Sequence, residues 1–298
     1  MSFLRLLWQI PAALLVLAML ISLINEYAIA RPSERIKDIP YVNAQSPDFD
    51  VERHLLDVYA PKLKTAQPFP VVVFIHGGNW DSGSKNLYSF IGRRLAKQGV
   101  VAVLINYRLS PAVRVPAMAD DCARAVLWTT QHIGEFGGDP NRIFVMGHSA
   151  GGGLAALVAT DHQLAAKWQL PEQVIKGAIL DDAAGLDMYD YLQKMEFPGD
   201  EQYLIPYSHD SAVWRAMSAL YQVTADSPPI LLYNGSRTYP GILRSTQKFH
   251  ERLLALGVKH EFKVLQGRKH VGMVAQLYWQ NNLIYQDLLK LVGAGKPE

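Results

Sequence analysis

A serine in a glycine-rich turn is the first group in this sequence that could do chemistry. Ser149 lies in the run Gly147-His148-Ser149-Ala150-Gly151, directly after the apolar stretch 143–146. A serine nucleophile must stand above the edge of a sheet, so the chain turns sharply and only small residues fit beside it. The turn leaves the N–H of Ala150 at a helix start, where it can stabilise a developing oxyanion. This pattern predicts Ser149 as the nucleophile of an acyl-transfer site.

A second glycine-rich turn precedes the serine by 71 residues. It reads His76-Gly77-Gly78-Asn79-Trp80 and follows the apolar stretch 71–75. Two successive glycines let backbone amides approach a substrate oxygen without obstruction by side chains. Together with the serine turn, it predicts an oxyanion hole. We expect His76 to be a structural hydrogen-bonding residue of this loop rather than a base.

Four motifs in this order resemble the α/β-hydrolase superfamily. They are His76-Gly77-Gly78-Asn79-Trp80, Asn106-Tyr107-Arg108-Leu109, Phe136-Gly137-Gly138-Asp139-Pro140-Asn141-Arg142 and Gly147-His148-Ser149-Ala150-Gly151-Gly152. More narrowly, the chain is similar to the His-Gly-Gly-Gly-Trp esterases, the group with bacterial carboxylesterases, kynurenine formamidase and prenylcysteine methylesterase. The resemblance covers the chain from about Leu55 to its end. It implies Ser149 as the nucleophile and the amides of Gly77, Gly78 and Ala150 as the oxyanion hole, with Asn79 replacing the family's third glycine.

The base of such a site must be a histidine, and His270 has the appropriate position. It follows the last predicted strand, 260–265, in a loop that can carry an imidazole to the serine at the edge of the sheet. The family that the motifs resemble also has its catalytic histidine here. His54, His132, His148 and His250 fall on a predicted edge strand, on helices or beside the serine, and we expect them to be structural.

The acid that orients the histidine departs from the family pattern. Thr238 stands where the family has an aspartate, and no carboxylate occurs between residues 227 and 250. An acid is still needed to hold the imidazole in one tautomer and to stabilise its charged form.

The predicted strand 174–180 ends in two adjacent carboxylates, Asp181 and Asp182. Asp181 is our candidate for the orienting acid, because some lipases of the superfamily place their acid on this strand. If the strand continues, Asp182 points the opposite way and should tolerate substitution. Asp187 and Asp226 are rival candidates.

Short apolar stretches alternate with longer amphipathic ones along residues 31–298, as is typical of βα units. The predicted strands are 71–75, 100–105, 143–146, 174–180, 230–233 and 260–265, and the predicted helices include 87–97, 118–135 and 245–256. An alternating stretch, 51–59, reads as an antiparallel edge strand. The fold class predicted is α/β, a doubly wound and mostly parallel sheet, and the resemblance makes it an α/β-hydrolase fold.

Residues 188–226 form a long connection rich in aromatic residues. A structureless loop of this length is uncommon, so we expect a small helical cap insertion over the active site. Its aromatic residues, Tyr189, Tyr191, Phe197, Tyr203, Tyr207 and Trp214, could line a substrate pocket or form the core of the cap, and the second role is favoured for most of them.

Residues 1–30 predict a signal peptide or a membrane anchor. Residues 6–24 are almost wholly apolar, Arg5 precedes them, and Ala28-Ile29-Ala30 resembles a cleavage site. The run is long for a signal peptide and close to the ~20 residues that span a bilayer. Either interpretation makes the protein extracytoplasmic, with possible membrane association through residues 1–30.

Composition excludes several classes of protein. A net charge of +2 from 29 basic and 27 acidic residues provides no field for binding nucleic acid. The single Cys122 excludes an internal disulfide framework and a cysteine-rich metal site. We therefore predict a serine hydrolase that cleaves small-molecule carboxylic esters through an acyl-enzyme, with no metal or organic cofactor and an oligomeric state that the sequence does not indicate. The alternatives are an amidase or formamidase on the same site, and a catalytically silent binding protein of this fold.

Overall fold

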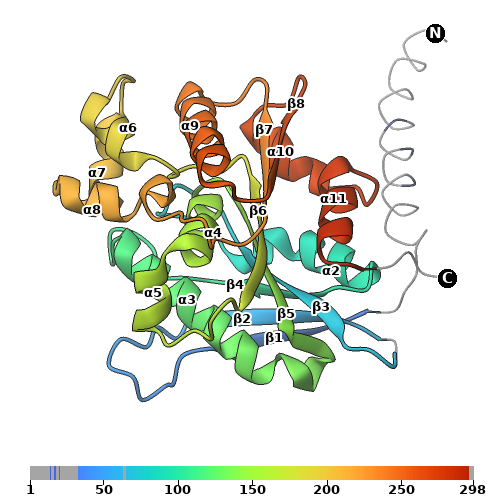
Figure 1. Cartoon of the computed structure of the whole chain (residues 1–298). Helices are drawn as coiled ribbons and strands as arrows, with labels where there is room; N and C mark the ends of the chain where they lie inside the picture. Colours follow the sequence, from blue (N-terminus) through green and yellow to red (C-terminus); the bar gives the residue numbers. More distant parts are fainter. Residues whose placement is uncertain (1–13, 15–16, 18–19, 21–32, 63–64, 295–298) are drawn as a thin grey trace, which may run out of the picture.

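A computed structural model of the chain describes residues 14, 17, 20, 33–62 and 65–294, and it contains one central sheet (Figure 1). The eight strands of the sheet have the order β1-β2-β4-β3-β5-β6-β7-β8. β1 and β2 are antiparallel to each other, β2 is antiparallel to β4, and all other neighbours are parallel. The strands are β1 Ser33–Pro40, β2 Leu55–Pro61, β3 Phe69–Ile75, β4 Val101–Ile105, β5 Gly138–His148, β6 Ile175–Asp181, β7 Ile230–Gly235 and β8 His260–Leu265.

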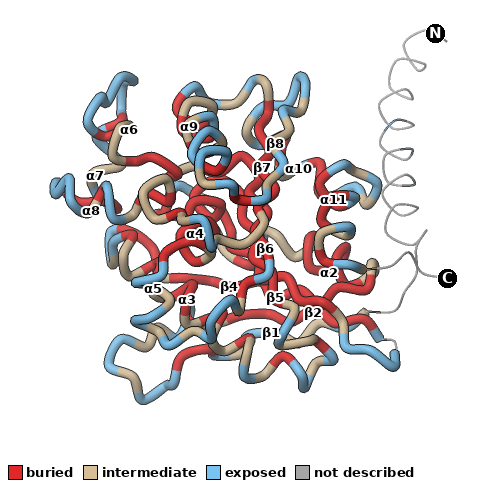
Figure 2. Tube along the Cα trace, in the orientation of Figure 1, coloured by how far each residue is buried: buried red, intermediate tan, exposed pale blue. Residues whose placement is uncertain are grey.

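The central strands β3 and β4 are apolar throughout because both faces of the sheet are covered. Along β3, Val71 and Val73 belong to the hydrophobic cluster on one face, while Val72 and Phe74 belong to the cluster on the other. Buried parallel strands are typically continuous apolar runs for this reason. Figure 2 shows the resulting band of buried residues through the middle of the molecule.

Helices supply the two covering layers. Side chains of α3, α4 and α9 pack on one face, and those of α2, α10 and α11 pack on the other. These helices and their short neighbours are η1 Lys85–Tyr88, α2 Ser89–Lys97, α3 Val115–His132, η2 Ile133–Phe136, α4 Ala150–Thr160, α5 His162–Lys167, α9 Pro240–Leu256, α10 His270–Ala275, η5 Gln276–Tyr278 and α11 Leu283–Leu291. The doubly wound, mostly parallel α/β class predicted from the sequence is confirmed.

One predicted strand has a different place in the sheet. The stretch 51–59 was expected to form an edge strand, but its strand, β2, begins at Leu55 and lies second in the sheet. β1 covers its outer side. The sequence of β1, Ser-Glu-Arg-Ile-Lys-Asp-Ile-Pro, is largely polar because an edge strand with a solvated face needs few apolar residues, and it therefore lacks a strong hydrophobic pattern.

Residues 188–226 contain short helices joined by turns, beside the carboxyl ends of the strands (Figure 1). Their aromatic residues divide between two environments. Tyr207 and Trp214 are buried, whereas Tyr191, Phe197 and Tyr203 line a cavity above Ser149. The elements are α6 Met188–Lys194, η3 Asp200–Tyr203, α7 Leu204–Tyr207, α8 Ser211–Ala216 and η4 Ala219–Tyr221.

The predicted signal peptide or membrane anchor, residues 1–30, lies outside the described residues except for positions 14, 17 and 20. Among the residues that are described, no helix has both the length and the apolar character needed to span a bilayer.

Candidate active site

Ser149 occupies a sharp turn between β5 and α4, at the carboxyl edge of the sheet. Its φ of 56° and ψ of −128° lie outside the regions that most residues adopt. The turn needs its flanking glycines, because a Cβ on Gly147 would lie 2.1 Å from the Gly151 oxygen, and a Cβ on Gly151 would lie 2.2 Å from the Ile75 oxygen. The sequence Gly-x-Ser-x-Gly is thus required by contacts within the turn and with the end of β3.

His270 begins α10, directly after β8 and its turn, and its ring reaches the serine. The distance from His270 Nε2 to Ser149 Oγ is 2.8 Å. On the other side of the ring, Nδ1 lies 2.6 Å from Asp182 Oδ2. A carboxylate at Nδ1 holds the proton there, so Nε2 is free to accept the hydroxyl proton of the serine. The structure therefore brings together the predicted pair of Ser149 and His270.

Asp182 follows the last residue of β6 with a φ of 50° and is fully buried. Besides His270, three other donors contact its carboxylate: the side chains of Asn234 and Thr238 and the N–H of Gly235. Burial by itself raises the pKa of Asp182, but these four hydrogen bonds outweigh it and hold that pKa below its ordinary value. Asp182 is therefore an ionised acceptor for the Nδ1 proton.

The prediction that the carboxylate of Asp181 contacts His270 is wrong. Asp181 is the last residue of β6, and strand alternation turns its side chain to the same face as Ile179, towards the layer of α2 and α11. Both of its carboxylate oxygens are buried without a hydrogen-bond partner. Burial, and secondarily the charge of Asp182, raises the pKa of Asp181 well above its ordinary value and so favours the protonated form of this carboxyl group. The rival Asp187 bonds Lys248 and Tyr221 instead.

Thr238 stands where the resembled family has an aspartate, and here Asp182 supplies the carboxylate instead. Its hydroxyl donates to Asp182 Oδ2, and its Oγ1 lies 3.5 Å from His270 Nδ1, which is too long for a useful hydrogen bond. Thr238 therefore contacts the acid rather than the base. No pattern in the sequence indicates this contact between Thr238 and Asp182.

The predicted oxyanion hole lies beside the serine. Gly78 has a φ of 129°, and a Cβ there would lie 2.3 Å from the Ser82 oxygen, so the loop requires glycine. A Cβ on Gly77 would lie 2.8 Å from the His148 oxygen, which places this loop directly against the serine turn. Among the hydrogen bonds of the described chain, none uses the N–H of Gly77, Gly78 or Ala150. All three are available as donors.

Two further histidines, His76 and His148, donate hydrogen bonds to backbone oxygens of the site. His76 Nδ1 donates to the Gly77 oxygen at 2.8 Å and its ring stacks on Tyr107, which confirms its predicted structural role. His148 Nε2 donates to the backbone oxygen of His270 at 3.2 Å. Burial lowers the pKa of His76 to about 4, and burial followed by the proximity of His270 lowers the pKa of His148 to about 3, so both are neutral. No pattern in the sequence indicates the contact between His148 and His270.

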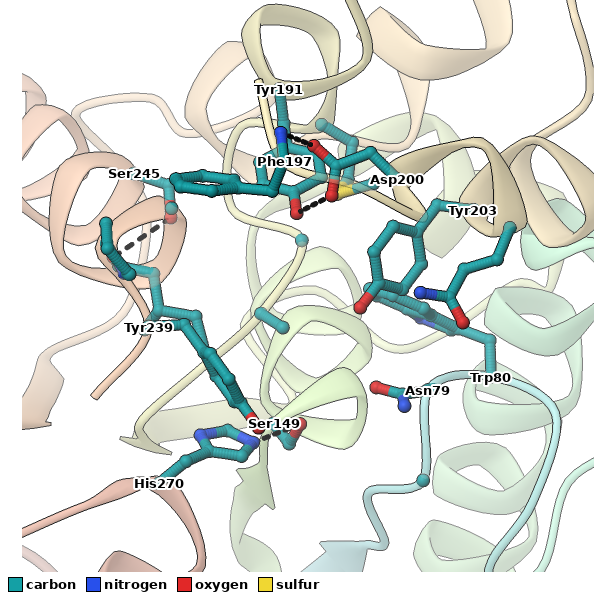
Figure 3. A pocket seen from close by; sticks show the side chains of 18 of the residues that line it. Asn79, Trp80, Ser149, Tyr191, Phe197, Asp200, Tyr203, Tyr239, Ser245 and His270 are labelled. Atoms are coloured by element: carbon teal, nitrogen blue, oxygen red, sulfur yellow. Dashed lines mark hydrogen bonds between the residues drawn. The ribbon is translucent and has the colours of Figure 1, made fainter. Parts of the chain in front are cut away.

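A cavity of about 690 Å³ opens above Ser149. Figure 3 shows Tyr239 and His270 on one side of it, and Asn79, Trp80 and Tyr203 on the other. Across the part of the chain that the structure describes, no three His, Cys, Asp or Glu side chains are grouped so that they could hold a metal ion. The chemistry available at this cavity is that of a serine, a histidine and a carboxylate linked by hydrogen bonds: Ser149, His270 and Asp182.

Comparisons with known proteins identify relatives of this chain. The family model BD-FAE matches residues 56–253. The chain is 26% identical to the probable isoprenylcysteine alpha-carbonyl methylesterase ICMEL1 of Arabidopsis thaliana, with 85% of this chain and 56% of that protein covered. It is 32% identical to the esterase LipC of Mycobacterium tuberculosis, with 74% and 60% covered. The chain thus spans a little over half the length of these curated relatives.

A solved structure is similar over almost its whole length. The esterase B of Lactobacillus rhamnosis superposes with a TM-score of 0.74 and 21% identity, with 97% of this chain and 96% of that chain covered. At this level of identity the likeness establishes the fold. The α/β-hydrolase fold expected from the sequence motifs is confirmed.

Proposed function

Because the chain belongs to the BD-FAE family, an α/β-hydrolase esterase family, we propose that it is a serine hydrolase that cleaves carboxylic esters through an acyl-enzyme. The observation that carries the proposal is the continuous chain of hydrogen bonds from Asp182 through His270 to Ser149 at the base of an open cavity. Such a chain of hydrogen bonds activates a serine hydroxyl, which is a weak nucleophile at its ordinary pKa.

Acylation starts with attack of Ser149 Oγ on the ester carbonyl, while His270 Nε2 takes the hydroxyl proton. Asp182 stabilises the imidazolium that forms, and the N–H groups of Gly77, Gly78 and Ala150 stabilise the oxyanion. His270 then gives its proton to the leaving alcohol oxygen. Deacylation repeats the sequence with water, and the carboxylic acid product leaves.

The carboxylate of Asp182 is suited to this role because its charge is held in place by several donors. Asn234, Gly235 and Thr238 fix its two oxygens, so little reorganisation is needed when His270 becomes charged. Asp181, the acid predicted from the sequence, has no part in this proposal.

The substrate in this proposal is a small-molecule ester larger than an acetate. We treat residues 188–226 as a cap insertion, because Tyr191, Phe197 and Tyr203 contribute to the cavity wall above Ser149. A cavity of about 690 Å³ falls within the usual range of ligand pockets, roughly 300–1,000 Å³. The methylesterase and esterase relatives support an ester as the substrate.

Labelling with a fluorophosphonate probe, combined with turnover of p-nitrophenyl butyrate, tests the proposal. We expect the full chain to be labelled at Ser149 and to hydrolyse the ester, and Ser149→Ala to lose both properties while it keeps the same circular dichroism spectrum. Labelling without turnover of esters, but with turnover of an anilide or formamide, would replace the esterase by an amidase. Absence of labelling and of all turnover would favour the catalytically silent binding protein.

We also propose that the hydrolase domain acts outside the cytosol. Support comes from the sequence alone: the apolar run 6–24 with basic residues on both sides, followed by Ala28-Ile29-Ala30. Amino-terminal sequencing of the native protein, with fractionation of cells that express it, tests this location. A chain that begins at Arg31 outside the cytosol, or an uncleaved chain in membranes, agrees with it, whereas an uncleaved chain free in the cytosol contradicts it.

A further inference from the structure

The cavity above Ser149 has two sides, which can be told apart by the residues labelled in Figure 3. Tyr239 lies on the side of His270, and the lining of the cavity also includes the aliphatic Ile242, Val271 and Val274. On the opposite side, the polar groups of Asn79 and Tyr203 line it beside the ring of Trp80. Neither the amide of Asn79 nor the hydroxyl of Tyr203 has a hydrogen-bond partner among the described residues, and Figure 3 shows both with their polar ends towards the cavity.

The position of His270 decides which half of an ester meets which wall. The base must return its proton to the leaving alcohol oxygen, so the alcohol half lies on the side of His270. The ring of Tyr239 is 5.1 Å from the ring of His270, and it therefore borders the alcohol half. With the carbonyl oxygen held at Gly78 and Ala150, the acyl half points to the opposite wall, where Asn79 and Tyr203 lie.

Asn79 is held next to the oxyanion loop by its own backbone. It follows Gly78 directly and has a φ of 50°, a left-handed conformation that asparagine tolerates better than most residues with a side chain. The resembled family has glycine at this position, which offers no side chain. Asn79 adds an amide, with one donor and one acceptor group, within a short distance of the carbonyl that Ser149 attacks.

Tyr203 is fixed by neighbouring rings. It packs edge-on against Trp80, with 5.9 Å between ring centroids, and against Tyr191, with 5.8 Å. Burial, followed by the nearby charge of Asp200, raises the pKa of Tyr203, so its hydroxyl keeps its proton and can donate a hydrogen bond. The ring is immobilised by packing, while the hydroxyl is free for a ligand.

We propose that Asn79 and Tyr203 select the acyl group, and that the preferred acyl group is uncharged and carries a hydroxyl or carbonyl oxygen a few bonds from the scissile carbonyl. This inference rests on the proposed ester hydrolysis. The absence of charge follows from the cavity, because its described lining includes the acidic Asp187 and Asp200 but neither lysine nor arginine. An anionic acyl group would meet no opposite charge, whereas a hydroxyl would satisfy both unpartnered groups.

Two esters with the same alcohol test the inference: p-nitrophenyl butyrate and p-nitrophenyl 3-hydroxybutyrate. We expect kcat/KM of the wild type to favour the hydroxylated ester by about 3- to 10-fold for each hydrogen bond gained. Tyr203→Phe keeps the packed ring and Asn79→Gly keeps the left-handed backbone, and each should reduce this preference by about 3- to 10-fold. The anionic p-nitrophenyl hemisuccinate should be a poorer substrate than the butyrate.

Tyr239→Phe is the matched control, because it removes a hydroxyl from the wall on the alcohol side. We expect its ratio of kcat/KM between the two esters to equal that of the wild type. Equal kcat/KM for both esters in the wild type, or a preference that survives in both Tyr203→Phe and Asn79→Gly, would overturn the inference while ester hydrolysis stands. If the wild type hydrolyses neither ester and fluorophosphonate does not label Ser149, the proposed function fails and the inference fails with it.

Discussion

Two histidine–aspartate pairs lie in the part of the chain that the structure describes, and they have similar hydrogen bonds but different surroundings. His270 bonds Asp182 at 2.6 Å, and His54 bonds Asp121 at 3.0 Å. Both carboxylates are fully buried and accept several other hydrogen bonds. For both, burial alone would raise the pKa, and the hydrogen bonds from their partners hold it below the ordinary value instead.

The two pairs differ at the ring nitrogen that does not contact the aspartate, which is Nδ1 in His54 and Nε2 in His270. In His54, Nδ1 accepts the backbone N–H of Asp50 at 3.0 Å, and the ring is fully buried. In His270, Nε2 faces the hydroxyl of Ser149 at 2.8 Å beside an open cavity. A ring nitrogen that already accepts a backbone hydrogen bond cannot take a proton from a nucleophile without losing that bond.

A histidine–aspartate pair is therefore not evidence of catalysis by itself. The pair of His54 and Asp121, which also bonds Arg108, joins the chain before β2 to α3 and contributes to stability. The pair of His270 and Asp182 holds an imidazole ready for proton transfer. Their difference can be tested by equivalent substitutions in both pairs.

The largest expected contrast is between His270→Gln and His54→Gln. Loss of the base should lower kcat for an ester substrate on the order of 10⁶-fold, as in well-studied triads where serine and histidine act as a unit. His54→Gln should retain kcat within about threefold, because it removes no proton acceptor from the cavity. Steady-state kinetics, normalised to the folded fraction by circular dichroism, measures both. Equal losses in the two variants would mean that the comparison of the pairs is mistaken.

The next contrast is between two adjacent carboxylates. Asp182→Asn should lower kcat on the order of 10⁴-fold, because an amide stabilises the wrong tautomer of His270. Asp181→Asn is its control and should leave kcat nearly unchanged, because the side chain of Asp181 makes no hydrogen bond and its backbone oxygen, which accepts the N–H of Ser149, is kept. This expectation reverses the one drawn from the sequence. A heavy loss of activity in Asp181→Asn alone would restore the original assignment.

A smaller effect, on stability rather than activity, is expected for Asp121→Asn. It removes the charge that the buried His54 and the half-buried Arg108 both contact, at 3.0 Å and 2.7 Å. Breaking a buried ion pair costs about 3–5 kcal/mol, which should lower the melting temperature by at least about 5 °C. Thermal unfolding followed by circular dichroism checks this change. Turnover per fluorophosphonate-labelled molecule should stay at the wild-type level, and a loss of that turnover would argue for a role in catalysis.

The smallest effect concerns pH. The folded-state pKa of Asp181 is raised, so the folded protein binds a proton that the unfolded chain has released above a pH of about 4. This carboxyl group therefore costs stability progressively as pH rises from about 4 towards its folded-state pKa. Asp181→Asn carries no such proton and should gain stability over the wild type at pH 8.

Denaturant unfolding of the wild type and Asp181→Asn at pH 5, 6.5 and 8 measures the effect. The difference in free energy of unfolding between the two proteins should widen with pH, by at most about 1.4 kcal/mol per pH unit. Other titrating groups are common to both proteins and cancel in this difference. A difference that is the same at all three pH values would show that Asp181 is ionised in the folded protein.

Much of the site was predictable because it depends on local sequence. Gly147 and Gly151 allow the strained turn at Ser149, and Gly78 has a positive φ that the oxyanion loop requires. A turn between an apolar strand and a helix is encoded by neighbouring residues, whatever the rest of the chain does. His270 was found by the same logic, since it follows the last strand.

The acid could not be predicted because Asp181 and Asp182 are adjacent residues of the same type. Their roles depend on which of them is the last residue of the strand. β6 ends at Asp181, so alternation sends that side chain into the layer of α2 and α11. Asp182 then adopts a positive φ, which turns its carboxylate towards His270, 88 residues further along the chain.

By itself, the sequence determined the class of sheet, the nucleophile turn, the glycine loop beside it and the histidine after the last strand. Each of these depends on hydrophobic periodicity or on backbone conformations that only certain residues allow. Only the tertiary structure decided that Asp182 is the acid, that Thr238 bonds this acid, and that Asn79 and Tyr203 share a wall of the cavity. These contacts join residues that are distant in the sequence, and their formation depends on how strands and helices pack rather than on any local pattern.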